Sequence, residues 1–152
     1  MVSSSGFSSS SSGARVVQTC LPDVDAAWPK LEATIREVCD LMGHSPRLEV
    51  LDDAFRDLVD LLIAIFRREE EAMASASDPR GTIHRQGHLG ILSHLAQLRS
   101  DARESGPSPS LSQRMRTTFL DAVHEHHVVL DALLGRHMQN WIRERDDEDE
   151  DD

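Results

Sequence analysis

Apolar residues recur every three or four positions through most of this chain, and interruptions of that pattern divide it into four segments. Such spacing is typical of helices that bury one face. Pro29 is interpreted as a first-turn proline, Gly43 as a helix stop and Ser45 as an N-cap. The four predicted helices cover residues 28–43, 46–76, 80–104 and 109–145. The sequence therefore predicts an all-α fold, an up-down-up-down four-helix bundle.

Composition agrees with one helical domain. The chain has 152 residues, of which 39% are apolar and only 4% aromatic, with no tyrosine. A core of Leu, Ile, Val, Ala and Met favours packed helices over a β-sandwich or barrel. We expect residues 1–22 to form a flexible serine-rich N-terminal tail, residues 23–145 the bundle, and residues 146–152 a disordered acidic tail.

The net charge of −11 argues against nucleic acid or an anionic membrane as a partner, because both attract basic surfaces. Seven of the 27 acidic residues form the closing run 146–152, so the bundle itself is only mildly acidic. Cys20 and Cys39 form no CxxC pair, and no targeting or membrane-spanning segment is apparent. These features predict reduced thiols and a cytoplasmic protein.

Four polar residues interrupt the predicted buried faces, namely Glu69, His84, His88 and His126. A bundle core normally excludes such groups unless they are paired, because burying an unpaired charge is costly. His84 and His88 are one helical turn apart and can face a single ion, and bundle cores are a recurrent location for metal sites. An HxxxH pair alone is a weak signal. The metal hypothesis depends on three helices contributing to one place.

Three motifs resemble the metal-binding motifs of the hemerythrin family: IFRREE at 65–70, HRQGH at 84–88 and HHVVLD at 126–131. The resemblance covers residues 28–142 and implies a hemerythrin-like bundle. It implies five metal ligands: Glu69, His84, His88, His126 and Asp131. On the fourth helix, His127 pairs with Asp131 at i, i+4 and remains an alternative to His126.

Two departures from the family pattern concern the second metal. Ile35 and Ile65 stand where the family has histidines that hold one iron of a pair. Ala122 replaces a common tryptophan. The resemblance therefore implies one non-haem iron per chain, with Mn or Zn as possible substitutes and no haem.

We therefore expect a metal-binding protein that senses or binds a gas or responds to redox conditions. Its expected ligands are a metal ion and a diatomic gas. No catalytic acid or base is evident near the cluster. Reversible oxygen carriage in the hemerythrin manner uses two irons, so a one-iron site should not perform it. Two alternatives stay open: a metal-free bundle that serves as a protein-interaction module, and a diiron oxygen-binding protein with atypical ligands. A histidine-phosphotransfer domain is disfavoured because His84 is predicted to be buried. The sequence identifies no protein partner.

Overall fold

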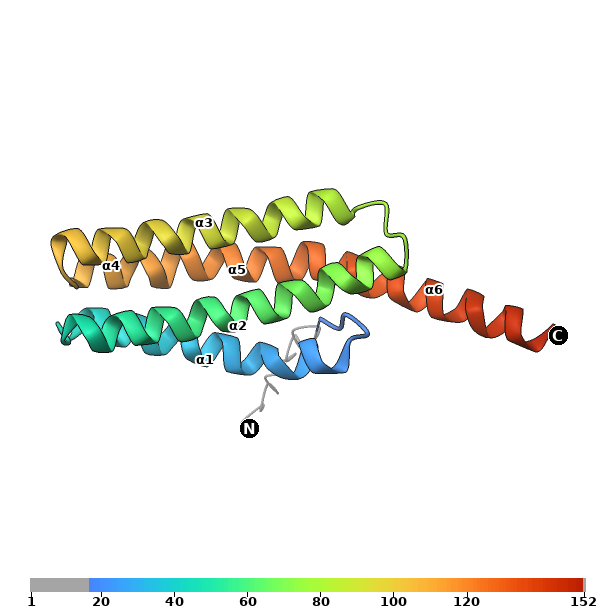
Figure 1. The fold of residues 1–152 in the computed structure, drawn as a ribbon, viewed down its shortest axis with the longest axis horizontal. Helices are drawn as coiled ribbons and strands as arrows, with labels where there is room; N and C mark the ends of the chain where they lie inside the picture. The colour runs from blue at the N-terminus through green and yellow to red at the C-terminus, as the bar shows by residue number, and fades with distance from the viewer. Residues whose placement is uncertain (1–16, 152) are drawn as a thin grey trace, which may run out of the picture.

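The computed structural model describes residues 17–151, and these residues form a bundle of four long helical segments (Figure 1). The first three segments are α1 (Pro22–Gly43), α2 (Leu48–Ser75) and α3 (Gly81–Ser105). The fourth is continuous and consists of α4 (Pro109–Arg114), η1 (Met115–Phe119), α5 (Leu120–His126), η2 (His127–Asp131) and α6 (Ala132–Glu150), where η marks π-helix. Successive segments pack side by side, and α1 closes the bundle against α4. The all-α up-down bundle predicted from the sequence is confirmed.

The core is aliphatic, as the composition predicts. On α1 and α2 most of the predicted buried positions are buried, including Ile35, Phe55 and Leu62, each with 0% exposure. Two predicted positions differ, because Leu48 is 47% exposed and Trp28 is only half-buried. The same holds on α3 for Ile91, Leu95 and Leu98, which lie on the face that also carries His84 and His88.

Two helix starts differ from the prediction. Helix α1 begins at Pro22, so Pro29 lies within the helix and not in its first turn. Pro22 itself occupies the first turn, where its missing N–H costs nothing. Ser45 does not cap α2, because Arg47 is the N-cap residue and Ser45 has a positive φ of 49° in the connection.

The fourth segment contains a correction of register. A constant helical period predicts Val129 and Leu133 on the buried face, yet Val129 is 50% exposed and Leu133 is half-buried, while Leu134 is 1% exposed. The π-helical segments η1 and η2 each place additional residues in a turn. After each π-helical segment, the positions that face the core are therefore shifted along the sequence relative to a constant helical period.

Residues 17–21 pack against the bundle, although the sequence interpretation places them in a flexible tail. Thr19 is fully buried, and its backbone N–H and hydroxyl both donate to the carboxylate of Asp25, at 3.0 and 2.8 Å. This strap crosses α6 at Gly135, where a Cβ atom would collide with the backbone carbonyl of Gln18. A glycine is needed there for the close approach. The serine-rich residues 1–16 lie outside the described residues.

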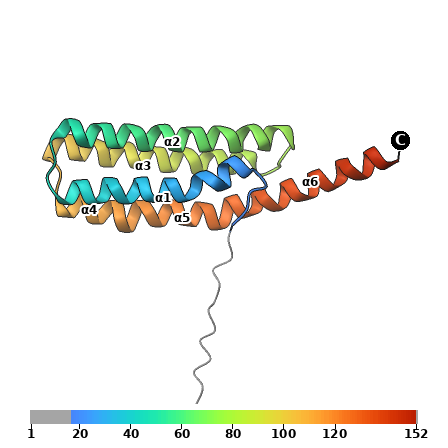
Figure 2. The ribbon, with the colours of Figure 1, turned by 90° about the horizontal axis from the view of Figure 1, so that it is seen from below.

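The chain end also differs from a disordered acidic tail. Helix α6 continues through Glu150 and projects beyond the other helices (Figures 1 and 2). Its acidic side chains from Asp146 onward are exposed. Helical geometry therefore extends into a segment that contributes nothing to the core.

Candidate metal site

Five buried side chains converge inside the bundle: Glu69 from α2, His84 and His88 from α3, His126 at the end of α5, and Asp131 at the end of η2. One potential ligand atom from each lies within 4.8 Å of all the others. The structure thus brings together all five residues that the sequence analysis selected. An ion of the size of Zn(II) or Fe(II) holds opposed ligands about 4 Å apart, so the spread of these five atoms is close to what a single ion requires.

The three imidazoles present the same atom, Nε2, to the two carboxylates. His88 Nε2 lies 2.8 Å from Glu69 Oε2. His84 Nε2 lies 3.1 Å from Asp131 Oδ1 and 3.5 Å from Glu69 Oε2, and His126 Nε2 lies 3.2 Å from Asp131 Oδ1. The ring centroids are 4.6 to 4.8 Å apart. The donors form a compact set of three nitrogens and two carboxylates.

Several of these atoms are close together without being hydrogen-bonded. Glu69 Oε1, His84 Nε2, His126 Nε2 and Asp131 Oδ1 are buried and have no hydrogen-bond partner among the described residues. The two contacts of Asp131 Oδ1 have short distances but lack the angles of hydrogen bonds. Buried polar atoms are normally satisfied, because leaving one unpaired costs about 1–3 kcal/mol. An ion between these atoms would satisfy them, so the donor set fits a metal.

The cluster favours the charged forms of His84 and Asp131. Burial lowers the pKa of His84, but its contacts with the carboxylates of Asp131 and Glu69 outweigh burial and raise this pKa to about 9. Burial raises the pKa of Asp131, but the contacts with His126, His127 and His84 lower it well below its usual range. A cation that binds His84 at neutral pH must displace its proton.

Further contacts orient the donors from outside the cluster. His88 Nδ1 lies 3.3 Å from Glu70 Oε1, and His127 Nδ1–H donates to Asp131 Oδ2 at 2.8 Å. A carboxylate on the outer nitrogen of a ligating histidine fixes the orientation of its ring and is usual at metal sites. His126 is therefore the residue whose Nε2 faces the cluster, whereas His127 holds the second oxygen of Asp131.

The π-helical geometry of η2 explains why both neighbouring histidines reach one carboxylate. In an ordinary α-helix, residues five apart point in different directions, whereas the wider π turn brings positions i and i+5 onto the same side. His126 and His127 precede Asp131 by five and four positions and contact its two different oxygens. A constant helical period in the sequence contains no signal for this arrangement.

Two aromatic side chains hold the rings in place, and the sequence analysis assigned neither to the site. Phe66 stacks on His88 with ring centroids 3.9 Å apart, and Trp28 stacks on His127 at 3.5 Å. The indole N–H of Trp28 donates to Glu32 Oε1 at 2.7 Å, which fixes the Trp28 ring in turn. Phe66 directly follows Ile65 in the IFRREE motif, but its role depends on tertiary packing.

Ile35 and Ile65 are both in the core, with 0% and 5% exposure. Ile65 lies one turn before Glu69 on the buried face of α2. Neither side chain has a metal-ligating atom. Both positions therefore contribute only hydrocarbon to the core.

A pocket of about 410 Å³ between α3 and the fourth segment borders the imidazole of His126. Gly87 and Gly90 form part of its α3 wall, and Ala122 and Val129 are on the opposite side. A Cβ atom at Gly87 would lie 2.9 Å from His126 Nδ1 and 3.0 Å from Leu130 Cδ1, whereas one at Gly90 would meet nothing within 4 Å. Gly87 therefore permits the close packing that positions His126.

The two glycines provide a matched test of this packing. Alanine in a helix interior is favoured over glycine by about 1 kcal/mol. Gly90→Ala should raise the free energy of unfolding by about that amount, whereas Gly87→Ala should yield no gain because its methyl group displaces His126 or Leu130. Denaturant unfolding of the two variants measures the difference. Equal stabilisation by both would show that Gly87 has no packing role.

Comparisons of this chain with known protein families, with characterised proteins and with solved structures find no match. Within residues 17–151, no helix has the length and apolar character required to cross a membrane. The fold and the buried cluster thus define the class as a four-helix bundle with a His/Glu/Asp cluster able to hold a metal ion.

Proposed function

We propose that this protein is a hemerythrin-like metal-binding protein that holds one non-haem iron ion in gas or redox sensing or binding. The observation that carries the proposal is the convergence of five buried donors, four of whose atoms lack a hydrogen-bond partner among the described residues. Three imidazoles with two carboxylates suit Fe(II), and also Mn(II) or Zn(II). A ferrous ion held in this way, with a free coordination position, supplies gas binding and one-electron chemistry.

The side chains around the cluster support one ion and not two. Asp131 presents Oδ1 to His84 and His126, while its Oδ2 accepts the hydrogen bond from His127. A carboxylate with one oxygen engaged in this way is not free to bridge to a second metal. Ile35 and Ile65 offer no nitrogen there.

The residues outside the ligand set have separate roles in this proposal. Glu70 and His127 orient His88 and Asp131, and the rings of Phe66 and Trp28 cover His88 and His127. Low solvent access strengthens the interaction of an ion with its ligands. We expect these residues to adjust affinity without binding the ion themselves.

Elemental analysis of the purified protein, followed by titration of chelator-treated protein with Fe(II) under argon, Mn(II) and Zn(II), tests the proposal. A ligand that binds only the folded chain stabilises it by about 2.7 kcal/mol at a concentration one hundred times Kd. We expect up to one ion per chain and a rise in melting temperature on metal addition. A chain with no bound metal that gains no stability from any of the three ions would contradict the proposal.

The second candidate is a metal-free bundle that acts as a protein-interaction module. It is favoured by one observation: the imidazoles and carboxylates of the cluster already compensate one another's charge, as the raised pKa of His84 and lowered pKa of Asp131 indicate. Structural ion networks of this kind also occur without a metal. The titration above separates the two candidates.

A further inference from the structure

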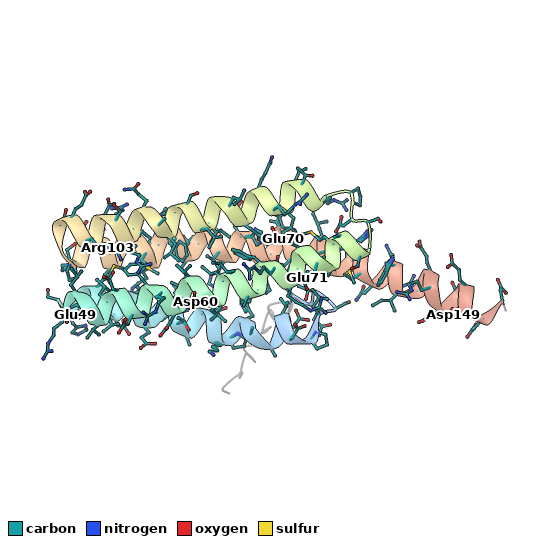
Figure 3. All side chains as sticks on the ribbon, in the orientation of Figure 1. Glu49, Asp60, Glu70, Glu71, Arg103 and Asp149 are labelled. Carbon is teal, nitrogen blue, oxygen red and sulfur yellow. The ribbon has the colours of Figure 1, made fainter. Side chains whose placement is uncertain are left out.

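A second pocket, of about 450 Å³, lies between α2 and α3, away from the metal cluster. Val59 and Ile63 from α2 and Leu92 and Ala96 from α3 provide its apolar part. Arg99 and Arg103 provide a basic end. Figure 3 shows Arg103 well separated along the bundle from Glu70, which contacts His88 of the His/Glu/Asp cluster.

The pocket is elongated along α3 and has different chemistry at its two ends. Its α3 residues run from Leu92 to Arg103, which corresponds to about 16 Å along a helix axis. Apolar side chains come first and the two arginines last. The shape and polarity fit a straight apolar chain with a charged head group.

The basic end carries an excess of positive charge. Arg103 Nε donates to Asp52 Oδ1 at 3.1 Å, while Arg99 Nε lies 3.6 Å from the same oxygen. The hydrogen bond from Arg103 and the charges of both arginines hold the pKa of Asp52 below its usual value. Two guanidinium groups therefore share one carboxylate, in a chain whose net charge is −11.

One hydrogen-bond donor at this end is left unused. Arg99 Nε is buried and has no hydrogen-bond partner in the described part of the chain. The Arg99 side chain as a whole is 27% exposed, so the N–H groups at the outer end of its guanidinium, and not the buried Nε, are the donors that a bound anion can reach. Guanidinium groups bind carboxylate and phosphate oxygens with matching geometry.

We propose that this pocket binds a free anionic amphiphile, with its head group on Arg99 and Arg103 and its straight apolar chain along Val59, Ile63 and Leu92. The charged head selects against neutral and cationic molecules of the same length. The apolar walls select against small anions without a chain. This site is independent of the metal proposal.

Decanoate, held below its micelle concentration, is a suitable probe, and binding is measured by calorimetry and by shifts of the methyl resonances of Val59, Ile63 and Leu92. Decanol should bind at least about tenfold more weakly, since charge-assisted hydrogen bonds are lost. Decyltrimethylammonium should not bind. Vesicles containing phosphatidylglycerol distinguish a membrane head group from a free amphiphile, and vesicle binding without decanoate binding would overturn the proposal.

Three variants connect the binding to the pocket. Arg99→Gln should weaken decanoate binding at least about tenfold, and Ala96→Leu should block it by filling the apolar part. Arg116→Gln is the control, because it removes the same charge from an exposed ion pair with Asp40 outside this pocket. Circular dichroism verifies that each variant is folded. Equal binding of decanoate and decanol, equal losses in Arg99→Gln and Arg116→Gln, or no binding of decanoate would each overturn the proposal.

Discussion

In protein carrying His84→Ala, addition of Fe(II) or Zn(II) should leave the melting temperature unchanged, whereas the same addition raises that of the original chain. His84 is 2% exposed and its Nε2 contacts carboxylates from both α2 and η2, so its loss removes a proposed ligand from the middle of the cluster. The informative quantity is the metal-induced difference in melting temperature. The melting temperature without metal also falls, because removing one partner from a buried ion pair costs about 3–5 kcal/mol.

His44→Ala is the matched control for this experiment. His44 is exposed at the end of α1, and its Nδ1 lies 2.6 Å from the backbone carbonyl oxygen of Asp40. The control should retain both its metal content and its metal-induced stabilisation. If His84→Ala retained the full metal-induced stabilisation, the ligand assignment would be wrong, even if the variant were less stable without metal.

The number of metal ions per chain should change when both missing histidines are restored. The double variant Ile35→His with Ile65→His supplies two nitrogens to the part of the core that now holds hydrocarbon, and the metal-to-protein ratio should rise from about one toward two. Without metal, the variant should be destabilised, because each new buried polar group lacks a partner. Elemental analysis and melting temperature with and without Fe(II) measure both effects.

The two single variants are the controls for the double one. Ile35→His or Ile65→His alone supplies one nitrogen, and a ratio near one is expected for each. A second ion also needs Asp131 Oδ2, for which it competes with His127. Two irons in the original chain, or an unchanged ratio in the folded double variant, would contradict the one-ion proposal or the alignment of Ile35 and Ile65.

Much of the fold follows from sequence because it depends on local rules. Apolar spacing, together with Gly43, Pro109 and the SGPSPS segment, places the ends of the four helices to within six residues. Four of the five cluster residues also follow, since a polar group on a buried face is visible in the spacing alone. Asp131 was predicted only through the resemblance to the hemerythrin motif. Their role as metal ligands remains a prediction.

The remaining features depend on contacts between distant parts of the chain. Helix packing brings together two stacked pairs, Phe66 with His88 and Trp28 with His127, and neither pair has a sequence signature. The π-helical turn at η2 breaks the assumption of a constant period, which is why Val129 was wrongly placed on the buried face. Local patterns predict which residues are inside more reliably than which atoms meet.

The strap of residues 17–21 has a consequence for the order in which the protein is completed during synthesis. Cys20 Sγ lies 3.7 Å from the carbonyl oxygen of Gly135, across 115 positions of the chain. At ribosomal rates of about 5–20 residues per second, roughly 6–23 s pass between the synthesis of Cys20 and that of Gly135. His126 and Asp131 are made just before Gly135, so the His/Glu/Asp cluster and the docking surface for the strap are completed at nearly the same time. Until then the thiol of Cys20 lacks this contact on the nascent chain and is available to thiol-modifying reagents.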